Sequence, residues 1–446
     1  MAKSPTLNPF ILSLPLLSAL LGCQFSAIKS QTWSESDGVV QETIRCEFAR
    51  TKGGSVQTFG AQAVLPLGPE PETVELSDES KPGATNINPN AKDADTFLRA
   101  ASGVRFLRQG DSDPFEVLIA QDSRRKLGIA RYDISLHDLK HAPHKAKSLG
   151  LPHVEVLPLD TPEAIAEFDD DSRDYASFRK KTKRDFEAMT NLPSGEILVL
   201  GSGSDMIKYQ KNGQSYRSQA HILTSDGRHL ATFDLLPFYL NLQENRFLIG
   251  DDNTVGKAEL NLEGVALRPA EQGFVIGFYH RGNVNGNGHN ALLEFDYSAW
   301  NKTLNAAQGL DLESARLLWK NLKPLRIVRI EAPRVASAAD PSGQPFPITI
   351  NDALFGSRNG KDTVLIPAGA EAEYTDAAGV QHDGEVIFAG LMVWQGMNKP
   401  NQGTCIIYQA PGDASPGHVS KFGKIEGLAA YNSRGRDLFS QSLYHE

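Results

Sequence analysis

Hydrophobic and polar residues recur along the chain in a pattern that five segments share. Each segment usually has an apolar residue, an acid, a glycine or alanine, and a second apolar residue. The segments are Phe186-Glu187-Ala188-Met189, Leu262-Glu263-Gly264-Val265, Asn351-Asp352-Ala353-Leu354, Ile425-Glu426-Gly427-Leu428 and a degenerate Ala101-Ser102-Gly103-Val104. Their second positions are 85, 76, 89 and 74 residues apart. The spacing predicts repeated units of about 80 residues.

Strand-like apolar runs follow the start of each unit. Second runs lie at 115–123, 196–205, 273–282, 363–371 and 437–446, and third runs at 128–135, 220–227, 291–298 and 405–412. Turn residues such as Pro193-Ser194-Gly195 precede the second runs, which indicates hairpins. Units of about four short strands are typical of a β-propeller. We therefore predict an all-β fold with a single β-propeller.

The chain ends bear on the number of blades. Only 20 residues follow Glu426, enough for two strands, and further strand-like runs lie at 41–49 and 55–65. A last blade built from N- and C-terminal strands would close the ring and give five blades. Six blades, one of them formed by an insertion, is the alternative.

Three stretches interrupt the repeats. A charged insertion at 136–183 contains a predicted amphipathic helix at 162–183, and a short helix is expected within 236–258. The proline-rich stretch 66–95 is expected to be a mobile linker. We expect short helical insertions and one linker around a β core.

Residues 1–22 have the features of an export signal. Lys3 precedes an apolar run at 10–21, which is too short for the roughly 20 residues of a membrane-spanning helix. The sequence Leu20-Leu21-Gly22-Cys23 resembles the bacterial lipobox. This resemblance implies that Cys23 is lipidated, that 23–38 is a tether and that 39–446 is the propeller. An ordinary cleaved signal peptide is the alternative.

The residue after the cysteine refines the predicted location. Gln24, where an Asp would favour the inner membrane, implies an outer-membrane lipoprotein that faces the periplasm of a bacterial envelope. The membrane would then be a partner through the lipid anchor. We expect a monomer.

Composition narrows the function classes. The 446 residues carry 45 basic and 54 acidic side chains, a net charge of −9, and 40% of them are hydrophobic. These values fit an acidic globular protein and exclude a polytopic membrane protein. A nucleic-acid partner is not expected, because it would need a basic surface. Besides Cys23 the chain has Cys46 and Cys405, which could form a disulfide or remain two buried thiols.

The ordered motifs carry a family resemblance. Segments at 184–204, 233–239, 258–266, 278–283 and 351–388 occur in the order seen in an uncharacterised family of bacterial propeller-like proteins, a domain of unknown function. The resemblance spans roughly 97–446 and implies the fold but no activity. The acid-Gly-Leu strand starts also bear a remote likeness to phytase-like and esterase-like propellers.

The repeated acids are the first candidate site. The first strand of each blade lines the channel of a propeller, which would bring together Glu187, Glu263, Asp352 and Glu426. Converging carboxylates must bind a cation, share protons or accept hydrogen bonds. One interpretation is a calcium site with Ser102 as a neutral fifth position. The other is that each acid caps backbone N–H groups and closes its blade.

The ends of the second strands are the second candidate site. They should meet at one rim of the channel, where the candidate ligand-binding residues are Asp122, Ser202, Ser204, Asp205, His280, Arg281, Asn283 and Glu371. His280 could act as an acid or base, and Arg281 could pair with an anion. Small polar residues also end strands without binding anything, but as a cluster these mark the best ligand site.

Two functions follow from these features. The first is an exported, lipid-anchored binding or scaffold module of the cell envelope, whose partner is a small molecule, a cation or an envelope protein. The alternative is a calcium-assisted phytase-like or esterase-like hydrolase, in which the four channel acids hold the metal and His280 and Arg281 engage the substrate.

Overall fold

The chain folds mainly into β-strands. The computed structural model describes residues 38–58, 73–75, 85–87, 101–107, 114–121, 126–135, 153–155, 184–204, 206, 210–211, 214–245, 260–282, 289–358, 361–375, 379, 381–397, 403–410 and 415–420. Three α-helices accompany the strands in these ranges. The predicted β class with short helical insertions is confirmed. The export signal, Cys23, the helix at 162–183 and the run at 437–446 lie outside the described residues.

The first two units are antiparallel four-stranded sheets. The first contains β4 (Ala101–Phe106), β5 (Pro114–Gln121), β6 (Lys126–Ser135) and β7 (His153–Glu155). The second contains β8 (Phe186–Asn191), β9 (Ile197–Gly201), β12 (Gln219–Leu223) and β13 (His229–Asp234). Between β9 and β12 lie the strand pair β10 (Gln210–Lys211) and β11 (Gln214–Ser215) and the 3-10 turn η4 (Tyr216–Ser218). In both units the first strand begins at the repeated segment, as predicted.

The third unit contains most of the helical residues. Its strands are β14 (Leu262–Pro269), β15 (Phe274–His280), β16 (Asn290–Asp296) and β17 (Arg326–Glu331). The helices α6 (Tyr297–Ala307) and α7 (Leu312–Asn321) connect β16 to β17, and α4 (Leu236–Gln243) precedes the unit. The helix α4 confirms the short helix expected within 236–258. The pair α6 and α7 was not predicted.

The fourth unit starts with a divided strand. Both β20 (Thr349–Ile350) and β21 (Leu354–Arg358) pair with β22 (Lys361–Thr375), which is followed by β23 (Gln381–Gln395) and β24 (Thr404–Gln409). The run at 405–412 is therefore the fourth strand of its unit and not the third, because the long β23 precedes it. Two short pairs lie outside the units: β18 (Arg334–Ala336) with β19 (Pro345–Pro347), and β2 (Thr73–Glu75) with β3 (Thr85–Ile87). The pair of β2 and β3 lies within 66–95, so part of the stretch expected to be a linker has regular structure.

The N-terminal strand β1 (Val40–Phe48) joins the third and fourth units at their outer edges. Its first part pairs in parallel with β17, from Val40 opposite Arg326, and its last part pairs in parallel with β24, where Cys46 lies opposite Cys405. The described partners of this strand are therefore β17 and β24, whereas the C-terminal strands expected to share its blade lie beyond residue 420. Residues 421–446 lie outside the described ranges, so closure of a ring by that segment stays a prediction.

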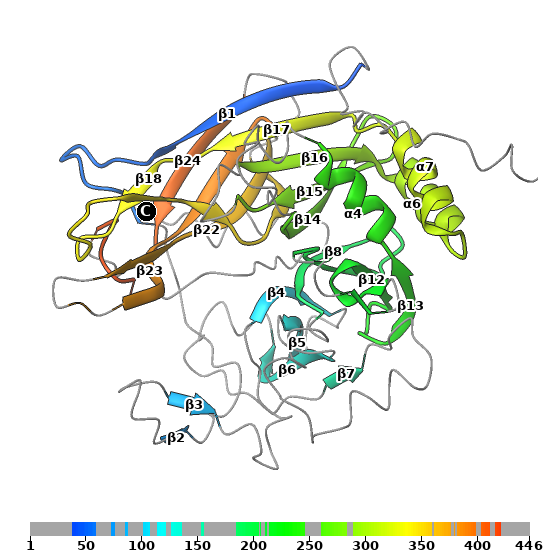
Figure 1. The fold of residues 1–446 in the computed structure, drawn as a ribbon, viewed down its shortest axis with the longest axis horizontal. Coiled ribbons are helices and arrows are strands. Elements are labelled where there is room, and N and C mark those ends of the chain that lie inside the picture. The colour runs from blue at the N-terminus through cyan, green and yellow to red at the C-terminus, as the bar shows by residue number, and fades with distance from the viewer. Residues whose placement is uncertain are drawn as a thin grey trace, which may run out of the picture.

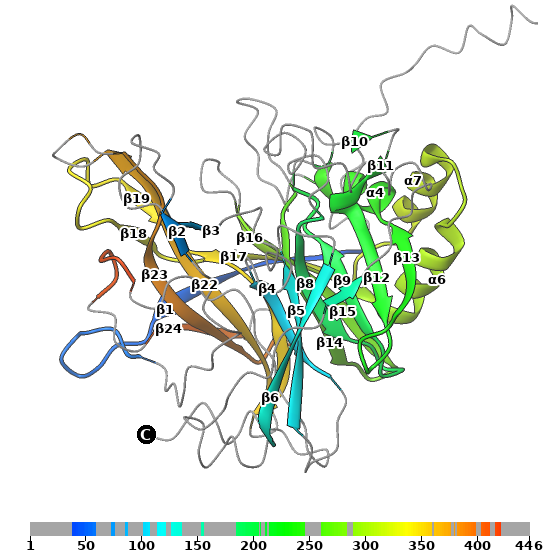
Figure 2. The same cartoon turned by 90° about the horizontal axis from the view of Figure 1, so that it is seen from below.

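The sheet that β1 completes has ten strands and curls back on itself. Its path runs from β14 through β17, β1 and β24 to β22 with β20 and β21. The two ends meet, since β14 contacts β21, and the result is a nearly closed, barrel-like sheet (Figures 1 and 2). The interior is lined by apolar residues from both units and from β1.

The starting strands of all four units lie next to one another. The strand β4 contacts β8, β8 contacts β14, and β14 contacts β21. The small residue of the repeat allows this approach. A methyl group on Gly264 would lie 2.7 Å from backbone atoms of both Asp352 and Ala353, too close for any side chain. The acid-Gly or acid-Ala pattern therefore marks the strands that pack around the middle of the molecule.

Central strands are buried on both faces. In β9, Ile197 and Val199 face a cluster shared with the first unit, whereas Leu198 and Leu200 face a cluster shared with the third unit and α4. Because successive side chains of a strand point to opposite faces, such a strand is apolar at nearly every position. This explains why the second runs appear as continuous apolar stretches in the sequence.

Cys46 and Cys405 form a disulfide between β1 and β24, with Cα atoms 4.5 Å apart. The bond decides between the two alternatives that the sequence left open. It fastens the N-terminal strand to the fourth unit across a sequence separation of 359 residues. Both cysteines lie in the apolar interior of the barrel-like sheet.

Reduction of this disulfide should lower the free energy of unfolding by about 2–5 kcal/mol, because the cross-link restricts the unfolded chain. Urea unfolding with and without reductant measures the loss. The double variant Cys46→Ala, Cys405→Ala is the control and should unfold alike under both conditions. A wild-type protein that is indifferent to reductant would contradict the assignment.

Candidate functional site

The second position of the repeat, an acid in three of the four described units and Ser102 in the first, lies at an irregularity in strand pairing. The register between first and second strands shifts at Ser102, at Glu187 and at Glu263. In the fourth unit Asp352 lies in the gap between β20 and β21. A β-bulge leaves one residue outside the ladder and redirects its side chain. The repeat therefore encodes a bulge that removes the acid from ordinary strand pairing.

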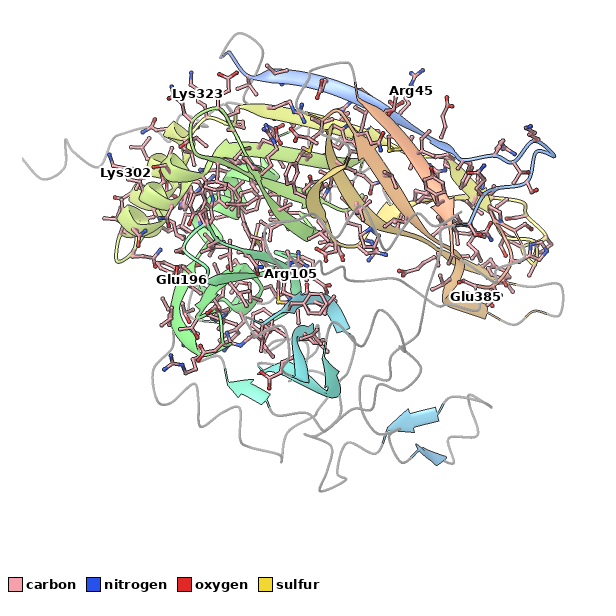
Figure 3. All side chains as sticks on the ribbon, turned by 180° about the vertical axis from the view of Figure 1, so that it is seen from behind. Arg45, Arg105, Glu196, Lys302, Lys323 and Glu385 are labelled. Atoms are coloured by element: carbon pink, nitrogen blue, oxygen red, sulfur yellow. A yellow bond between two sulfur atoms is a disulfide. The ribbon has the colours of Figure 1, made fainter. Side chains whose placement is uncertain are left out.

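Asp352 pairs with an arginine from the first unit. Arg105 Nη1 lies 3.1 Å from Asp352 Oδ2, and Arg105 Nη2 also donates to the carbonyl oxygen of Ala353 at 3.3 Å. The side chains of Arg105 and Asp352 are 4% and 0% exposed. Arg105 lies near the middle of the molecule (Figure 3). This buried ion pair connects the first unit to the fourth.

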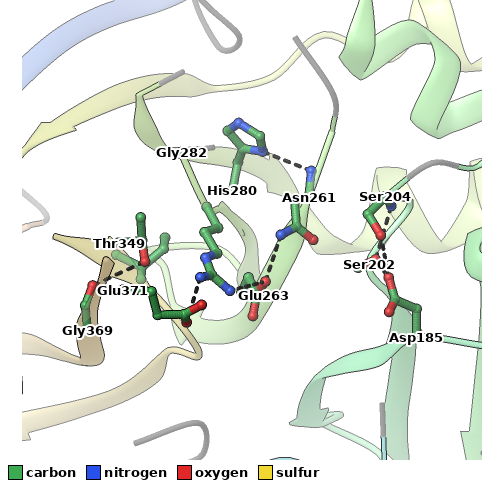
Figure 4. Close-up of polar contacts among 12 residues, drawn as sticks. Asp185, Ser202, Ser204, Asn261, Glu263, His280, Gly282, Thr349, Gly369 and Glu371 are labelled. Carbon is green, nitrogen blue, oxygen red and sulfur yellow. Dashed lines mark hydrogen bonds and ion pairs between the residues drawn. The ribbon is translucent and has the colours of Figure 1, made fainter. Parts of the chain in front are cut away.

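Carboxylates from neighbouring units surround Arg281, which follows β15. Its Nη1 lies 3.3 Å from Glu263 Oε1, and its Nη2 lies 2.9 Å from Glu371 Oε1 in β22. Burial by itself would lower the pKa of Arg281, but Glu263, Glu371 and Glu187 raise it above its ordinary value. Figure 4 shows the ion pairs with Glu263 and Glu371 as dashed lines. Three of the predicted site acids therefore act on one arginine.

His280 lies beside this arginine and is fully buried. Its Nδ1 accepts a hydrogen bond from the Asn261 backbone N–H at 3.1 Å, while the Asn261 side chain donates to Glu263 Oε1 at 2.7 Å. Burial lowers the pKa of His280 to about 4. At neutral pH the ring is therefore uncharged and carries its proton on Nε2.

A second group of polar side chains is centred on Asp185. Ser202 and Ser204 both donate their hydroxyl protons to Asp185 Oδ2. Arg217 Nη1 lies 3.5 Å from the same oxygen and donates to Ser204 Oγ at 2.9 Å. Among the described residues Asp185 is the one non-glycine residue with a positive φ, 57°. Asp tolerates this left-handed conformation better than most residues.

The two groups lie in one region, which we call the hub. It comprises Asp185, Glu187, Ser202, Ser204, Arg217, Asn261, Glu263, His280, Arg281 and Glu371. The end of β9 contacts the start of β14 here, because the Leu262 backbone N–H donates to the Ser202 carbonyl at 2.8 Å. Figure 4 shows the Asp185 group beside the Glu263 group. Of the residues predicted at the rim, the structure brings Ser202, Ser204, His280, Arg281 and Glu371 into this region.

The hub has a buried layer and a partly exposed layer. Ser202, Glu263 and His280 are buried, and they support groups that remain partly accessible to solvent. The partly exposed residues are Glu187, Ser204, Asn261, Arg281 and Glu371. The other predicted site residues, Asp122, Asp205, Asn283 and Glu426, lie outside the described residues.

Several hub residues and partners were missed by the sequence reasoning. Asp185, Arg217, Asn261 and Arg105 belong to no repeated pattern. Asp185 and Asn261 immediately precede the starting strands of their units, which is the one signal that could have found them. Nothing in the sequence distinguishes Arg105 and Arg217 from other arginines.

Arginine side chains supply positive charge beside the channel acids, for which the sequence predicted a bound cation. Arg105 faces Asp352, and Arg281 faces Glu263 and Glu371. Within the described ranges no group of three or more His, Cys, Asp or Glu side chains is arranged to hold a metal ion. Calcium binding by a set that includes Glu426 stays a prediction.

Comparison with known proteins identifies the family. The model of a family of unknown function (DUF6910) matches residues 179–440, more than half of the chain. The chain belongs to this family. The match contains the second, third and fourth units, including the whole hub, and it agrees with the unknown-function resemblance noted in the motifs. No curated protein matches the chain.

Solved structures give only distant similarities. Drosophila Semaphorin 1b, extracellular domains 1–2, is 9% identical with a TM-score of 0.27, over 76% of this chain and 64% of that one. Drosophila Plexin A in complex with Semaphorin 1b is 9% identical with a TM-score of 0.22, over 65% and 71% of the two chains. The chain thus spans less than two thirds of the first structure. Similarities with TM-scores this low do not support a conclusion about the fold of this protein.

Removing the charge of Asp352 should destabilise the protein strongly. Asp352→Asn leaves Arg105 buried beside a neutral side chain, which should cost about 3–5 kcal/mol of unfolding free energy. The exposed pair Arg45 and Glu331, with side chains 82% and 43% exposed, provides the control. Glu331→Gln should cost less than about 1 kcal/mol. Equal costs in urea unfolding would contradict a structural role for the buried pair.

His280 should make stability depend on pH. Between its folded pKa of about 4 and its ordinary value of 6.5, the unfolded chain binds a proton that the folded chain does not. The unfolding free energy should therefore fall by up to about 3 kcal/mol as the pH drops from 6.5 to 4. His280→Asn should flatten this dependence relative to the exposed-site control His418→Asn. Parallel pH profiles for the two variants would refute the assignment.

Proposed function

We propose that this protein is an exported, lipid-anchored binding module of the bacterial cell envelope, and that the hub is its ligand site. The Cys46–Cys405 disulfide supports export, because such bonds form and persist in oxidising compartments. The resemblance of Leu20-Leu21-Gly22-Cys23 to the lipobox supports lipidation at Cys23, and Gln24 supports a position at the outer membrane facing the periplasm.

The observation that carries the ligand site is the layered arrangement of the hub. Partly exposed Ser204, Asn261, Arg281 and Glu371 come from three units, and buried hydrogen bonds and ion pairs hold them in place. Side chains held in this way lose little further freedom when they bind, which favours recognition of a polar ligand. The ligand class is a small polar molecule or a polar segment of an envelope protein.

We also propose that the four units are blades of a single β-propeller. The successive contacts among β4, β8, β14 and β21 support an arrangement about one axis. The repeat at Ile425-Glu426-Gly427-Leu428 supports a fifth blade, and six blades is the alternative. A helix-dominated circular dichroism spectrum would refute the proposal.

A ligand of the hub should be detectable as thermal stabilisation. A panel of cationic, anionic and neutral polar molecules, including Ca²⁺, should contain compounds that raise the unfolding temperature, and at 100 times Kd the stabilisation is about 2.7 kcal/mol. Glu371→Gln should abolish the effect of cations that contact this carboxylate and should strengthen the effect of anions that replace it beside Arg281, because Glu371 is a partly exposed acid that pairs directly with Arg281.

The control for this screen is Glu385→Gln. Glu385 lies on the same hairpin, is also partly exposed and accepts a hydrogen bond from Tyr374 of that hairpin. It should leave ligand stabilisation intact. A blank panel, or equal stabilisation of both variants, would count against the hub as the ligand site.

A further inference from the structure

Arg281 carries more hydrogen-bond donors than its neighbours use. Within the described residues, two of its five N–H groups donate in hydrogen bonds, one to Glu263 at 3.3 Å and one to Glu371 at 2.9 Å. The side chain is 12% exposed, so solvent reaches part of it. A guanidinium can only donate, and its planar donors match the two oxygens of a carboxylate. The remaining donors of Arg281 therefore favour a ligand group that is anionic and accepts hydrogen bonds.

The two carboxylates that pair with Arg281 differ in how firmly they are placed. Glu263 belongs to the same unit as Arg281, is 5% exposed and also accepts a hydrogen bond from the Asn261 amide at 2.7 Å. Glu371 comes from the fourth unit and is 23% exposed. The pairing of β22 with β23 shifts register on both sides of Glu371, so this residue lies on an interrupted part of its strand. Of the two partners, Glu371 is therefore the one that an incoming anion replaces more easily.

The acids around Arg281 limit the charge of such a ligand. Burial by itself lowers the pKa of Arg281. The carboxylates of Glu263, Glu371 and Glu187 raise this pKa above its ordinary value, because they favour the charged form. A ligand with a single negative charge that replaces Glu371 leaves the charge beside Arg281 unchanged. A dianion such as sulfate would add a charge near Glu263 and Glu187, where like charges repel. These surroundings therefore favour a carboxylate over a sulfate or phosphate group.

The amide oxygen of Asn261 adds a second requirement. The carboxylate of Glu263 can only accept, which places the amide nitrogen of Asn261 toward it and the amide oxygen on the other side (Figure 4). This oxygen has no hydrogen-bond partner among the described residues, and Asn261 is partly exposed. The Asn261 amide and Arg281 Nη1 contact the same oxygen of Glu263, so the two groups are neighbours. A carboxylate bound to Arg281 therefore lies near an acceptor, which favours a ligand with an N–H or O–H group close to its carboxylate.

We propose that the hub binds a molecule with a carboxylate and a neighbouring hydrogen-bond donor, with the carboxylate at Arg281 and the donor at Asn261. Amino acids, hydroxy acids and the carboxyl terminus of a polypeptide share this chemistry. Glu371 holds the carboxylate position itself, so it is an autoinhibitory acid with which the ligand competes for Arg281. The proposal rests on the hub being the ligand site, as proposed above, and it adds the chemical class of the ligand.

Saturation-transfer NMR titrations of the full-length protein with N-acetylglycine test the competition. Glu371→Gln removes the competing charge and keeps the size of the side chain. It should lower the apparent Kd at least about 10-fold, because a competitor that holds most molecules weakens the observed binding by that fraction. Loss of the fold cannot produce tighter binding. Glu385→Gln, on the same hairpin, is the matched control and should bind as the wild type does. An unchanged or higher apparent Kd for Glu371→Gln would overturn the proposal.

Related probes test the two parts of the ligand separately. N-acetylglycinamide has no carboxylate and should not bind, and sulfate should bind more weakly than N-acetylglycine. Equal binding of N-acetylglycinamide, or stronger binding of sulfate, would refute the choice of a carboxylate. Acetate lacks the donor and should also bind more weakly than N-acetylglycine, and Asn261→Ala should remove this difference. Equal binding of acetate and N-acetylglycine to the wild type would refute the role of Asn261.

A longer probe distinguishes the two sources of this chemistry. N-acetylated tri-alanine with a free carboxyl terminus presents the same carboxylate and amide N–H at the end of a short chain. Tighter binding of this peptide than of N-acetylglycine supports a polypeptide terminus as the ligand. Equal or weaker binding supports a small free acid.

Failure of this proposal is distinguishable from failure of the hub as a ligand site. If N-acetylglycine and acetate bind neither protein, while a cation of the screening panel stabilises the wild type and not Glu371→Gln, the hub stands and the carboxylate ligand is refuted. If no compound distinguishes Glu371→Gln from Glu385→Gln, both proposals are refuted. Tighter binding of N-acetylglycine to Glu371→Gln alone supports both.

Discussion

Burial of carboxylates in the middle of this fold depends on arginines that reach them from elsewhere in the chain. A buried carboxylate loses several kcal/mol of solvation, which is recovered only when a cation and hydrogen-bond donors are well placed. Arg105 of the first unit pairs with Asp352 of the fourth, and Arg281 of the third unit pairs with Glu371 of the fourth. If the units shifted relative to one another, a charge would remain buried without its partner. The ion pairs therefore fix the arrangement of the units more than they add to its stability.

Two features of the repeat prepare this arrangement locally. The bulge at the acid position takes Glu187 and Glu263 out of regular pairing with the next strand. The small residue that follows lets neighbouring strands approach, as Gly264 does against Asp352 and Ala353. A larger residue would separate β14 from the 352–353 backbone and move the carboxylates away from their arginines. The acid and the small residue are thus both needed for the close packing of the starting strands, which explains why they recur together.

The sequence predicted what depends on local pattern. The repeated acids, the hairpins and the apolar second runs were found because strand periodicity and turn residues are short-range signals. Arg105 and Asp352 are 247 residues apart, and no local pattern relates them. The place of β1 depends likewise on parallel pairing with two distant strands, which also decides whether Cys46 meets Cys405. The helix α6 was not predicted, although Trp300, Leu304 and Ala307 follow helical spacing, because its first residues continue the apolar strand-like run at 291–298.

The chemistry available to a ligand at the hub follows from how fully its charges are engaged. Arg281 already contacts two carboxylates, and His280 is neutral at physiological pH because burial lowers its pKa to about 4. A ligand must therefore hydrogen-bond to the network as it stands or displace one partner of Arg281. Glu371, with a side chain 23% exposed, can turn toward solvent, whereas Glu263 at 5% is held by Asn261 as well. An anionic ligand that replaces Glu371 would keep Arg281 neutralised and would loosen the contact between the third and fourth units. Binding at the hub would in that case be coupled to the packing of the two units that β1 and the disulfide hold together at their outer edges.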